Sequence, residues 1–200
     1  MEFLDLSFAN KQDFDYSILQ YATNLTTLRI ALNGDSSFLR NLNKLQYLYI
    51  TNIKTNDYQE IGNCSNLVYL DIMINWYAGD KLSDYSFLSQ LKKIKILNLC
   101  GNAAYIDNFS SIANNENLEY LYIGNPFIYT SNRAVIDGEL IKEMKSLKTL
   151  IMINATFKDH SVLDNVDWID ISEDDYDKTE ALKCTFGFLE SNLMDTSLSS

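Results

Sequence analysis

Residues of the types that carry most enzyme chemistry are few and scattered in this chain. His160 is the single histidine, and it stands beside Asp159 with no cysteine or paired carboxylate motif nearby. A general base must lie within hydrogen-bond reach of the proton that it takes, so a solvated or capping role is favoured for His160. His-Glu-x-x-His, Gly-x-Ser-x-Gly and phosphate-binding glycine loops do not occur in the sequence. We therefore predict no catalytic residues, no cofactor and no enzymatic activity.

Metal binding and thiol chemistry are also poorly supported. The acidic run 173–177 suggests calcium, but it lacks the glycine and the distal glutamate of a calcium-binding loop. The cysteines Cys64, Cys100 and Cys184 are odd in number and far apart, with no Cys-x-x-Cys pair. No base that would activate Cys100 is visible, and Cys64 suits a buried free thiol. The sequence predicts neither a metal site nor a disulfide framework.

The side chains that do recur at a regular spacing are aromatic, and their chemistry is that of binding. Tyrosines stand two residues apart at 47 and 49 and again at 120 and 122, and Tyr69 and Asp71 share this spacing. Alternate residues of a β-strand point to one face of a sheet, and Tyr and Trp give interfaces rigid contact area. Alternatively, these aromatics only suit parallel strands and pack against their neighbours. The predicted binding residues are Tyr47, Tyr49, Tyr69, Asp71, Asn98, Tyr120, Tyr122, Trp168 and Asp170.

The elements that would position these residues follow a repeated phrase, Leu-x-x-Leu-x-Leu/Ile. The spacing between successive units runs from 19 to 29 residues, within or just below the 20–29 residues typical of leucine-rich repeats. The first and last units are the weakest. The units begin at Met1, Leu25, Leu45, Leu67, Ile94, Leu118, Leu147 and Val166.

The second half of each unit carries a different apolar pattern. Phe38, Leu39 and Leu42 precede one strand, and similar sets lie at 82–91 and 140–144. This spacing predicts short helical or 3₁₀ turns with one apolar face. The residues expected to cap them are Ser36, Asp57, Asp84 and Asp159.

The stretch from Leu82 to Asn102 resembles a leucine-rich repeat of the short, internalin-like class of bacterial proteins. The resemblance implies an α/β fold: a right-handed leucine-rich-repeat solenoid, or horseshoe, with a parallel concave β-sheet and helical or 3₁₀ turns on the convex side. It also implies a ladder of buried asparagines at Asn33, Asn75 and Asn102. About eight repeats would fill residues 1–173, and residues 174–200 would form a C-terminal cap and tail.

Two repeat units are longer than the others, and each carries its extra residues after its predicted strand. Insertions in solenoids map to one face, often the binding face. We expect the insertions to form a binding rim, although local loop packing explains them equally well. The rim residues are Trp76, Tyr77, Phe127 and Tyr129.

The first residues, 1–7, would form an exposed edge strand, which solenoids normally cover. Either upstream repeats have been removed, or a partner or self-association through this N-terminal edge protects it. No stretch of the sequence resembles a signal peptide or a spanning helix. We expect a cytoplasmic protein if the chain is complete, and a secreted or surface-attached protein if it is a fragment.

The charge balance limits the classes of partner that this chain could bind. Sixteen basic residues stand against 27 acidic ones, for a net charge of −11. This argues against nucleic acid and against anionic membranes, because both are bound through Lys and Arg. The expected function is a non-enzymatic module that binds a protein partner on an aromatic and acidic concave face. The alternatives are the targeting segment of a larger enzyme or surface effector, and a carbohydrate-binding solenoid.

Overall fold

One long parallel sheet runs through the computed structural model of the chain. The structure describes residues 1–7, 15–32, 34–51, 58–73, 84–100, 110–124, 134–136, 138–153, 155–157, 159, 161 and 167–171. Eight strands lie in the order β1-β2-β3-β4-β5-β6-β8-β10, so the strands of this sheet lie side by side in the order in which they occur in the sequence. The strands of this sheet are β1 (Phe3–Leu6), β2 (Thr27–Ala31), β3 (Tyr47–Thr51), β4 (Tyr69–Met73), β5 (Ile96–Cys100), β6 (Tyr120–Gly124), β8 (Thr149–Ile153) and β10 (Asp167–Ile171).

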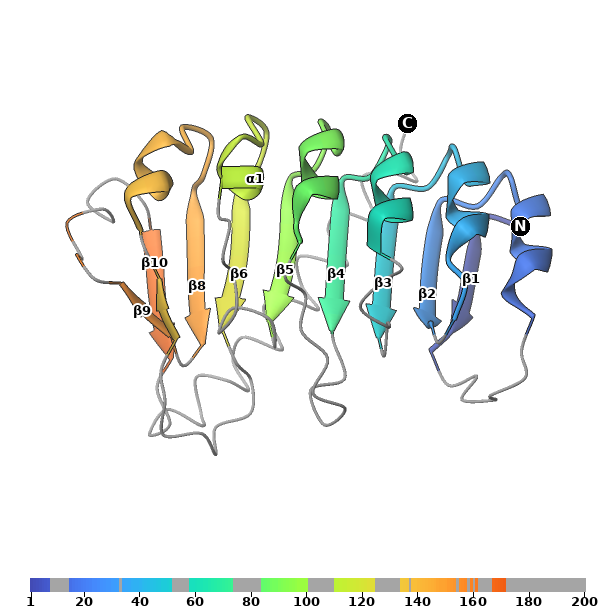
Figure 1. The fold of residues 1–200 in the computed structure, drawn as a ribbon, viewed down its shortest axis with the longest axis horizontal. Helices are drawn as coiled ribbons and strands as arrows, with labels where there is room; N and C mark the ends of the chain where they lie inside the picture. The colour runs from blue at the N-terminus through green and yellow to red at the C-terminus, as the bar shows by residue number, and fades with distance from the viewer. Residues whose placement is uncertain are drawn as a thin grey trace.

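Short helical turns connect these strands, as the sequence predicts. A parallel pair needs a crossover connection, and each crossover from β1 through β8 contains one short turn of similar length. The turns lie in a row above the strands in Figure 1. They are η1 (Tyr16–Tyr21), η2 (Ser37–Asn41), η3 (Tyr58–Asn63), η5 (Ser86–Gln90) and η7 (Gly138–Glu143), all 3₁₀, and the α-helical turn α1 (Ser110–Ala113). The predicted leucine-rich-repeat solenoid is therefore confirmed.

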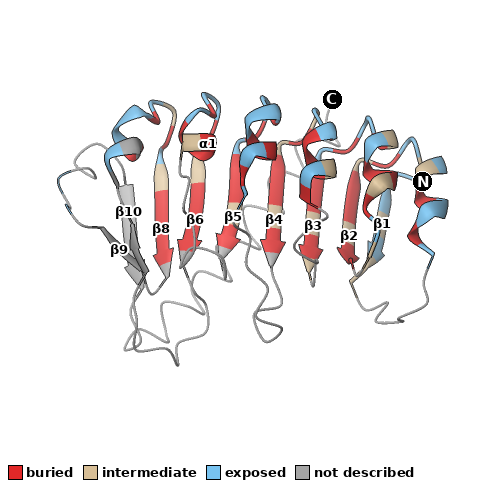
Figure 2. Cartoon of the chain, viewed as in Figure 1, coloured by how far each residue is buried: buried red, intermediate tan, exposed pale blue. Residues whose placement is uncertain are grey.

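The leucines of the repeat form the core. The middle leucine of each unit pairs in register with that of the next unit, from Leu4 on β1 to Leu150 on β8. Leu28 and Leu150 are fully buried, and each such side chain contributes about 1.5–3 kcal/mol relative to an exposed one. Figure 2 shows this burial as a continuous band along the central strands. The core is thus one layer that runs the length of the solenoid.

The turns begin with a repeated aspartate cap. Asp84 Oδ1 accepts a hydrogen bond from the Ser86 amide at 2.8 Å, and Asp159 Oδ1 accepts from the Ser161 amide at 2.9 Å. Both predicted caps are confirmed. The Ser36 prediction is wrong, because the capping oxygen of η2 belongs to Asp35, which accepts from the Ser37 amide at 2.9 Å.

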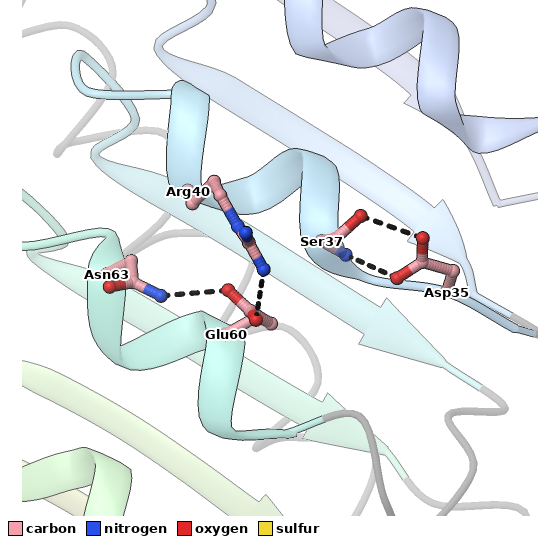
Figure 3. Close-up of polar contacts among 5 residues, drawn as sticks. All are labelled: Asp35, Ser37, Arg40, Glu60 and Asn63. Atoms are coloured by element: carbon pink, nitrogen blue, oxygen red, sulfur yellow. Dashed lines mark hydrogen bonds and ion pairs between the residues drawn. The ribbon is translucent and has the colours of Figure 1, made fainter.

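Figure 3 shows this Asp35 cap together with a contact between successive turns. Arg40 on η2 pairs with Glu60 on η3 at 2.6 Å, and Asn63 donates to the same carboxylate at 2.9 Å. The Arg40 side chain is 55% exposed. Exposed pairs contribute about 1 kcal/mol or less, so this contact aligns the turns more than it stabilises them.

A second polar contact between repeats is buried. Cys64 is a buried free thiol, as predicted, and its Sγ donates to the Leu39 carbonyl at 3.5 Å. Burial, together with the nearby Glu60, raises the thiol pKa to about 12. Asn115 occupies the same place in its own repeat and donates to the equivalent carbonyl, that of Leu88, at 3.2 Å. Both side chains tie one turn to the turn before it.

Two features of the C-terminal half differ from the sequence prediction. Strands β7 (Ala134–Ile136) and β9 (Ala155–Phe157) pair in parallel as a separate two-stranded sheet, which the repeat pattern does not predict. In addition, β10 joins β8 one residue away from the predicted register: Trp168 lies beside Leu150, where the repeat alignment predicts Ile169. The last unit is the least regular copy of the repeat, so its Val-x-x-Ile-x-Ile phrase is a weak guide to register.

Several predicted features lie outside the described residues. They are the asparagine ladder Asn33, Asn75 and Asn102, the cap Asp57, His160, the acidic run 173–177, Cys184 and the segment 174–200.

Candidate functional site

The predicted binding residues lie in two columns across the sheet. Strand pairing sets Tyr47 beside Tyr69, Tyr69 beside Ile96 and Ile96 beside Tyr120. The second column runs in the same way through Tyr49, Asp71, Asn98 and Tyr122. The columns are two positions apart along each strand, with one core leucine between them, so both project from the face opposite the core leucines. We call this surface the aromatic face, with the members Tyr47, Tyr49, Tyr69, Asp71, Ile96, Asn98, Tyr120 and Tyr122.

The expectation that the whole aromatic face meets solvent is wrong. Tyr69 and Tyr122 are each 1% exposed and Ile96 is 2% exposed. Tyr47 is also buried, whereas Tyr49 and Tyr120 are partly buried. The placement of the columns is confirmed by the register, but the accessibility of their members is far lower than the sequence suggests.

The aromatic face has a small apolar cluster of its own. Tyr47, Tyr69 and Ile96 pack together as buried residues, separate from the leucine core, with Tyr49 and Tyr120 against them. The rings of Tyr49 and Tyr69 are tilted by 35° with centroids 4.8 Å apart, an arrangement that aromatic pairs favour. Burial raises the pKa of Tyr47, so its hydroxyl remains a proton donor well above neutral pH.

Polar groups border this cluster. The Arg29 guanidinium lies over the Tyr49 ring, 4.4 Å from its centroid, which is within cation–π range. Asn98 Nδ2 donates to Asp71 Oδ2 at 3.1 Å, so the two polar members of the second column are fixed to each other. The site combines rigid rings with a few oriented polar groups, which suits recognition.

Arg29 and Ile96 are not among the predicted site residues, although both belong to the columns. The repeat alignment could have predicted both, because each stands at the same place in its unit as a tyrosine of the site. A prediction that selects aromatic and acidic types from the columns omits an apolar residue at the centre of the cluster and the cation beside it.

Trp168 and Asp170 do not continue the columns as predicted. In β10 it is Asp167 that lies beside Thr149, and Ile169 that lies beside Ile151. The register of β10 therefore differs by one residue from the predicted one. The structure does not describe the side chains of this strand, so the assignment of Trp168 and Asp170 to the aromatic face stays a prediction. The predicted rim residues Trp76, Tyr77, Phe127 and Tyr129 lie outside the described residues.

Within the described part of the chain, no group of three or more His, Cys, Asp and Glu side chains comes together to hold a metal ion. None of the helices described there has the length and apolar character to span a bilayer.

Comparison with known proteins gives a structural match only. No protein-family model matches the chain, and no curated protein sequence matches it. Among solved structures, the chain is similar to internalin C2 of Listeria monocytogenes, with a TM-score of 0.61 and 27% identity over 76% of this chain and 62% of that one. The chain is an internalin-like leucine-rich-repeat protein.

Internalin F of the same organism is a second similar structure, with a TM-score of 0.49 and 20% identity over 79% of the internalin-like chain and 58% of internalin F. The internalin-like chain thus spans less than two thirds of the length of either solved internalin.

Proposed function

We propose that this internalin-like protein is a non-enzymatic recognition module that binds a protein partner through its aromatic face. The observation that carries the proposal is the alignment of five tyrosines on β3, β4 and β6 by strand register. Interfaces are enriched in Tyr and depleted of Lys, and the two columns contain no lysine among the described strands.

The similarity to internalin C2 supports the proposal at the level of the fold. Solenoids of this kind present an extended concave surface, and their sites are built from residues that repeat from strand to strand. The low exposure of Tyr69 and Tyr122 limits which members a partner can reach directly. Tyr49, Asp71, Asn98 and Tyr120, which are only partly buried, are therefore the members that we expect to make first contact.

The test is an affinity measurement with alanine variants. A partner captured from the native source is purified, and its Kd is measured by calorimetry for the unchanged protein and for Tyr49→Ala with Tyr120→Ala. If the pair forms a hot spot, binding weakens by about 2 kcal/mol or more, which is roughly 30-fold in Kd. The control is Tyr21→Ala, which removes a tyrosine that is 78% exposed and lies on η1, away from the face.

Equal affinity of the double variant and the unchanged protein would remove the aromatic face as the binding surface. Circular dichroism and the unfolding temperature of each variant show whether a loss of binding reflects a loss of fold.

A further inference from the structure

Lysines gather along one edge of this otherwise acidic protein. The segments that lead from each turn into the next strand lie along the upper edge of the sheet in Figure 1, and we call them the entry edge. They are residues 22–26, 42–46, 64–68, 91–95, 114–119 and 144–148. The entry edge contains six lysines and two glutamates, so its net charge is +4 in a chain whose total is −11. The lysines, all exposed, are Lys44, Lys92, Lys93, Lys95, Lys145 and Lys148.

The backbone of the entry edge is fixed by hydrogen bonds from one repeat to the next. The Glu119 amide donates to the Lys95 carbonyl at 2.9 Å, and the Lys148 amide donates to the Glu119 carbonyl at 2.8 Å. Equivalent bonds join the earlier segments, from Thr26 to Lys95. A surface that is already ordered loses less conformational entropy when it binds a ligand.

Two of the lysines are oriented by neutral acceptors. Lys44 Nζ donates to Asn24 Oδ1 at 2.7 Å, and Lys93 Nζ donates to Asn66 Oδ1 at 2.6 Å. Asn24 and Asn66 belong to the entry segments before β2 and β4, so each contact joins neighbouring repeats. An amide carbonyl positions an ammonium group without cancelling its charge, and one contact leaves two of the three ammonium donors for a ligand.

The positive charge recurs at every second strand. Lysines stand before β3, β5 and β8, whereas the segments before β2 and β4 are uncharged and the segment before β6 is acidic. Glu119, before β6, pairs with both Lys95 and Lys148, so it offsets only one of their two charges. Strands lie about 4.8 Å apart, and the lysine groups therefore follow each other at intervals of about 10 Å.

This interval matches one conformation of an extended peptide. A polyproline II helix has three residues per turn and rises about 3.1 Å per residue, so every third side chain points the same way at intervals of about 9.3 Å. Acidic side chains at every third position would meet the lysines before β3, β5 and β8 in turn.

We propose that the entry edge is a second interaction surface, which binds an acidic segment of a protein in the polyproline II conformation with a carboxylate at every third residue. The lysines provide charge complementarity, and the two-strand interval fixes the register. Nucleic acid fits less well, because double-stranded DNA carries one charge for about every 1.7 Å of its axis. The acidic remainder of the chain also repels a long polyanion.

The experiment measures the Kd of labelled synthetic peptides for the full chain by fluorescence anisotropy at low ionic strength. The test peptide repeats Glu-Pro-Pro four times. The control peptide has the same composition, with its four glutamates in one block. The repeat peptide should bind several-fold more tightly than the block peptide, and its affinity should fall as salt is added, because exposed charges are screened.

The protein variant is Lys44→Gln with Lys93→Gln, in which glutamine still donates a hydrogen bond but carries no charge. It should bind the repeat peptide about tenfold more weakly. The matched control, Arg40→Gln with Lys142→Gln, removes two exposed cations from η2 and η7 and should leave the Kd unchanged. Both variants change the net charge equally, so the comparison isolates the place of the charge.

Three results would each overturn the proposal: no saturable binding of the repeat peptide up to about 1 mM protein, equal affinity for the two peptides, or an equal loss of affinity in the two variants. A thymidine pentanucleotide, whose four phosphates match the charge of the repeat peptide, provides the nucleic-acid comparison. Tighter binding of this oligonucleotide than of the repeat peptide would assign the entry edge to nucleic acid and would also overturn the proposal.

The entry edge and the aromatic face are tested with different ligands and different variants. Failure of peptide binding leaves the aromatic face as the surface for the partner, and failure of the tyrosine test leaves the entry edge as a binding surface.

Discussion

At the scale of single residues, different side chains at equivalent places of the repeat form the same kind of hydrogen bond. Cys64 and Asn115 occupy equivalent places in their repeats, and each donates to the equivalent carbonyl of the preceding turn, that of Leu39 or of Leu88. Asn115 also donates to the Ser111 carbonyl at 3.0 Å and is 3% exposed. Sulfur is a weak donor and an amide a stronger one, so Asn115 should contribute more to stability than Cys64.

We expect Asn115→Ala to lower the free energy of unfolding by about 1–3 kcal/mol, because two buried hydrogen bonds from the Asn115 amide, to the Leu88 and Ser111 carbonyls, are lost. Urea unfolding followed by circular dichroism measures this. Asn114→Ala is the matched control, since Asn114 is the exposed neighbour on the same turn. An Asn115→Ala protein as stable as the control would show that the buried amide plays no part in joining the turns.

At the scale of elements, the aspartate caps make the turns sensitive to acid. Hydrogen bonds from the hydroxyl and amide of Ser37 lower the pKa of Asp35, and those from the amide and hydroxyl of Ser86 lower the pKa of Asp84. A carboxyl whose pKa is lower in the folded state adds stability above its unfolded pKa of about 3.9. That stability is lost as the pH falls through the folded pKa.

The double variant Asp35→Asn with Asp84→Asn keeps an oxygen for the cap but removes the titration. Its unfolding temperature should therefore fall less between pH 5 and about pH 2 than that of the unchanged protein. Glu116→Gln with Glu143→Gln removes the same number of carboxylates from exposed turn positions and serves as the control. Parallel acid curves for the unchanged protein and the Asp variant would contradict a role of the caps in acid sensitivity.

The elements also show what the sequence can and cannot predict. Strands β1 to β6 and β8 are predictable because a leucine phrase with constant internal spacing fixes both strand and register. The predicted register is wrong for β10, where the leucine phrase of the repeat is degenerate. The predicted cap at Ser36 is wrong because Asp35 and Ser36 are adjacent in the sequence. The backbone conformation determines which of the two side chains accepts from the Ser37 amide, and the sequence does not show it.

For the aromatic face, too, one feature can be predicted from the sequence and another cannot. Its columns follow from periodicity, so the leucine phrase alone aligns Tyr47, Tyr69 and Tyr120. Their burial does not follow from it, because periodicity predicts which strands are neighbours and not how much of each side chain remains accessible. Tyr122 has the sequence signature of an exposed contact residue and is 1% exposed.

At the scale of the whole molecule, the described sheet has an incompletely covered strand, β1, at one end. Leu28 on β2 is fully buried, but its partner Leu4 on β1 is only partly buried. The exposed large apolar side chains found among the described residues, Met1, Phe3, Ile18 and Tyr21, all lie on β1, on η1 or just before β1. An edge strand with apolar surface is a template for pairing with another chain.

We therefore expect the 200-residue chain to self-associate through β1, as a symmetric dimer whose two edge strands run antiparallel. Sedimentation equilibrium over a range of micromolar concentrations measures this. Phe3→Glu with Ile18→Glu should shift the chain to monomer, because it places two carboxylates in the apolar contact. Ser65→Glu with Ser89→Glu adds the same charge at exposed positions on other turns and should not. A chain that is monomeric throughout, or a dimer that survives the β1 variant, would show that this edge is not where two copies meet.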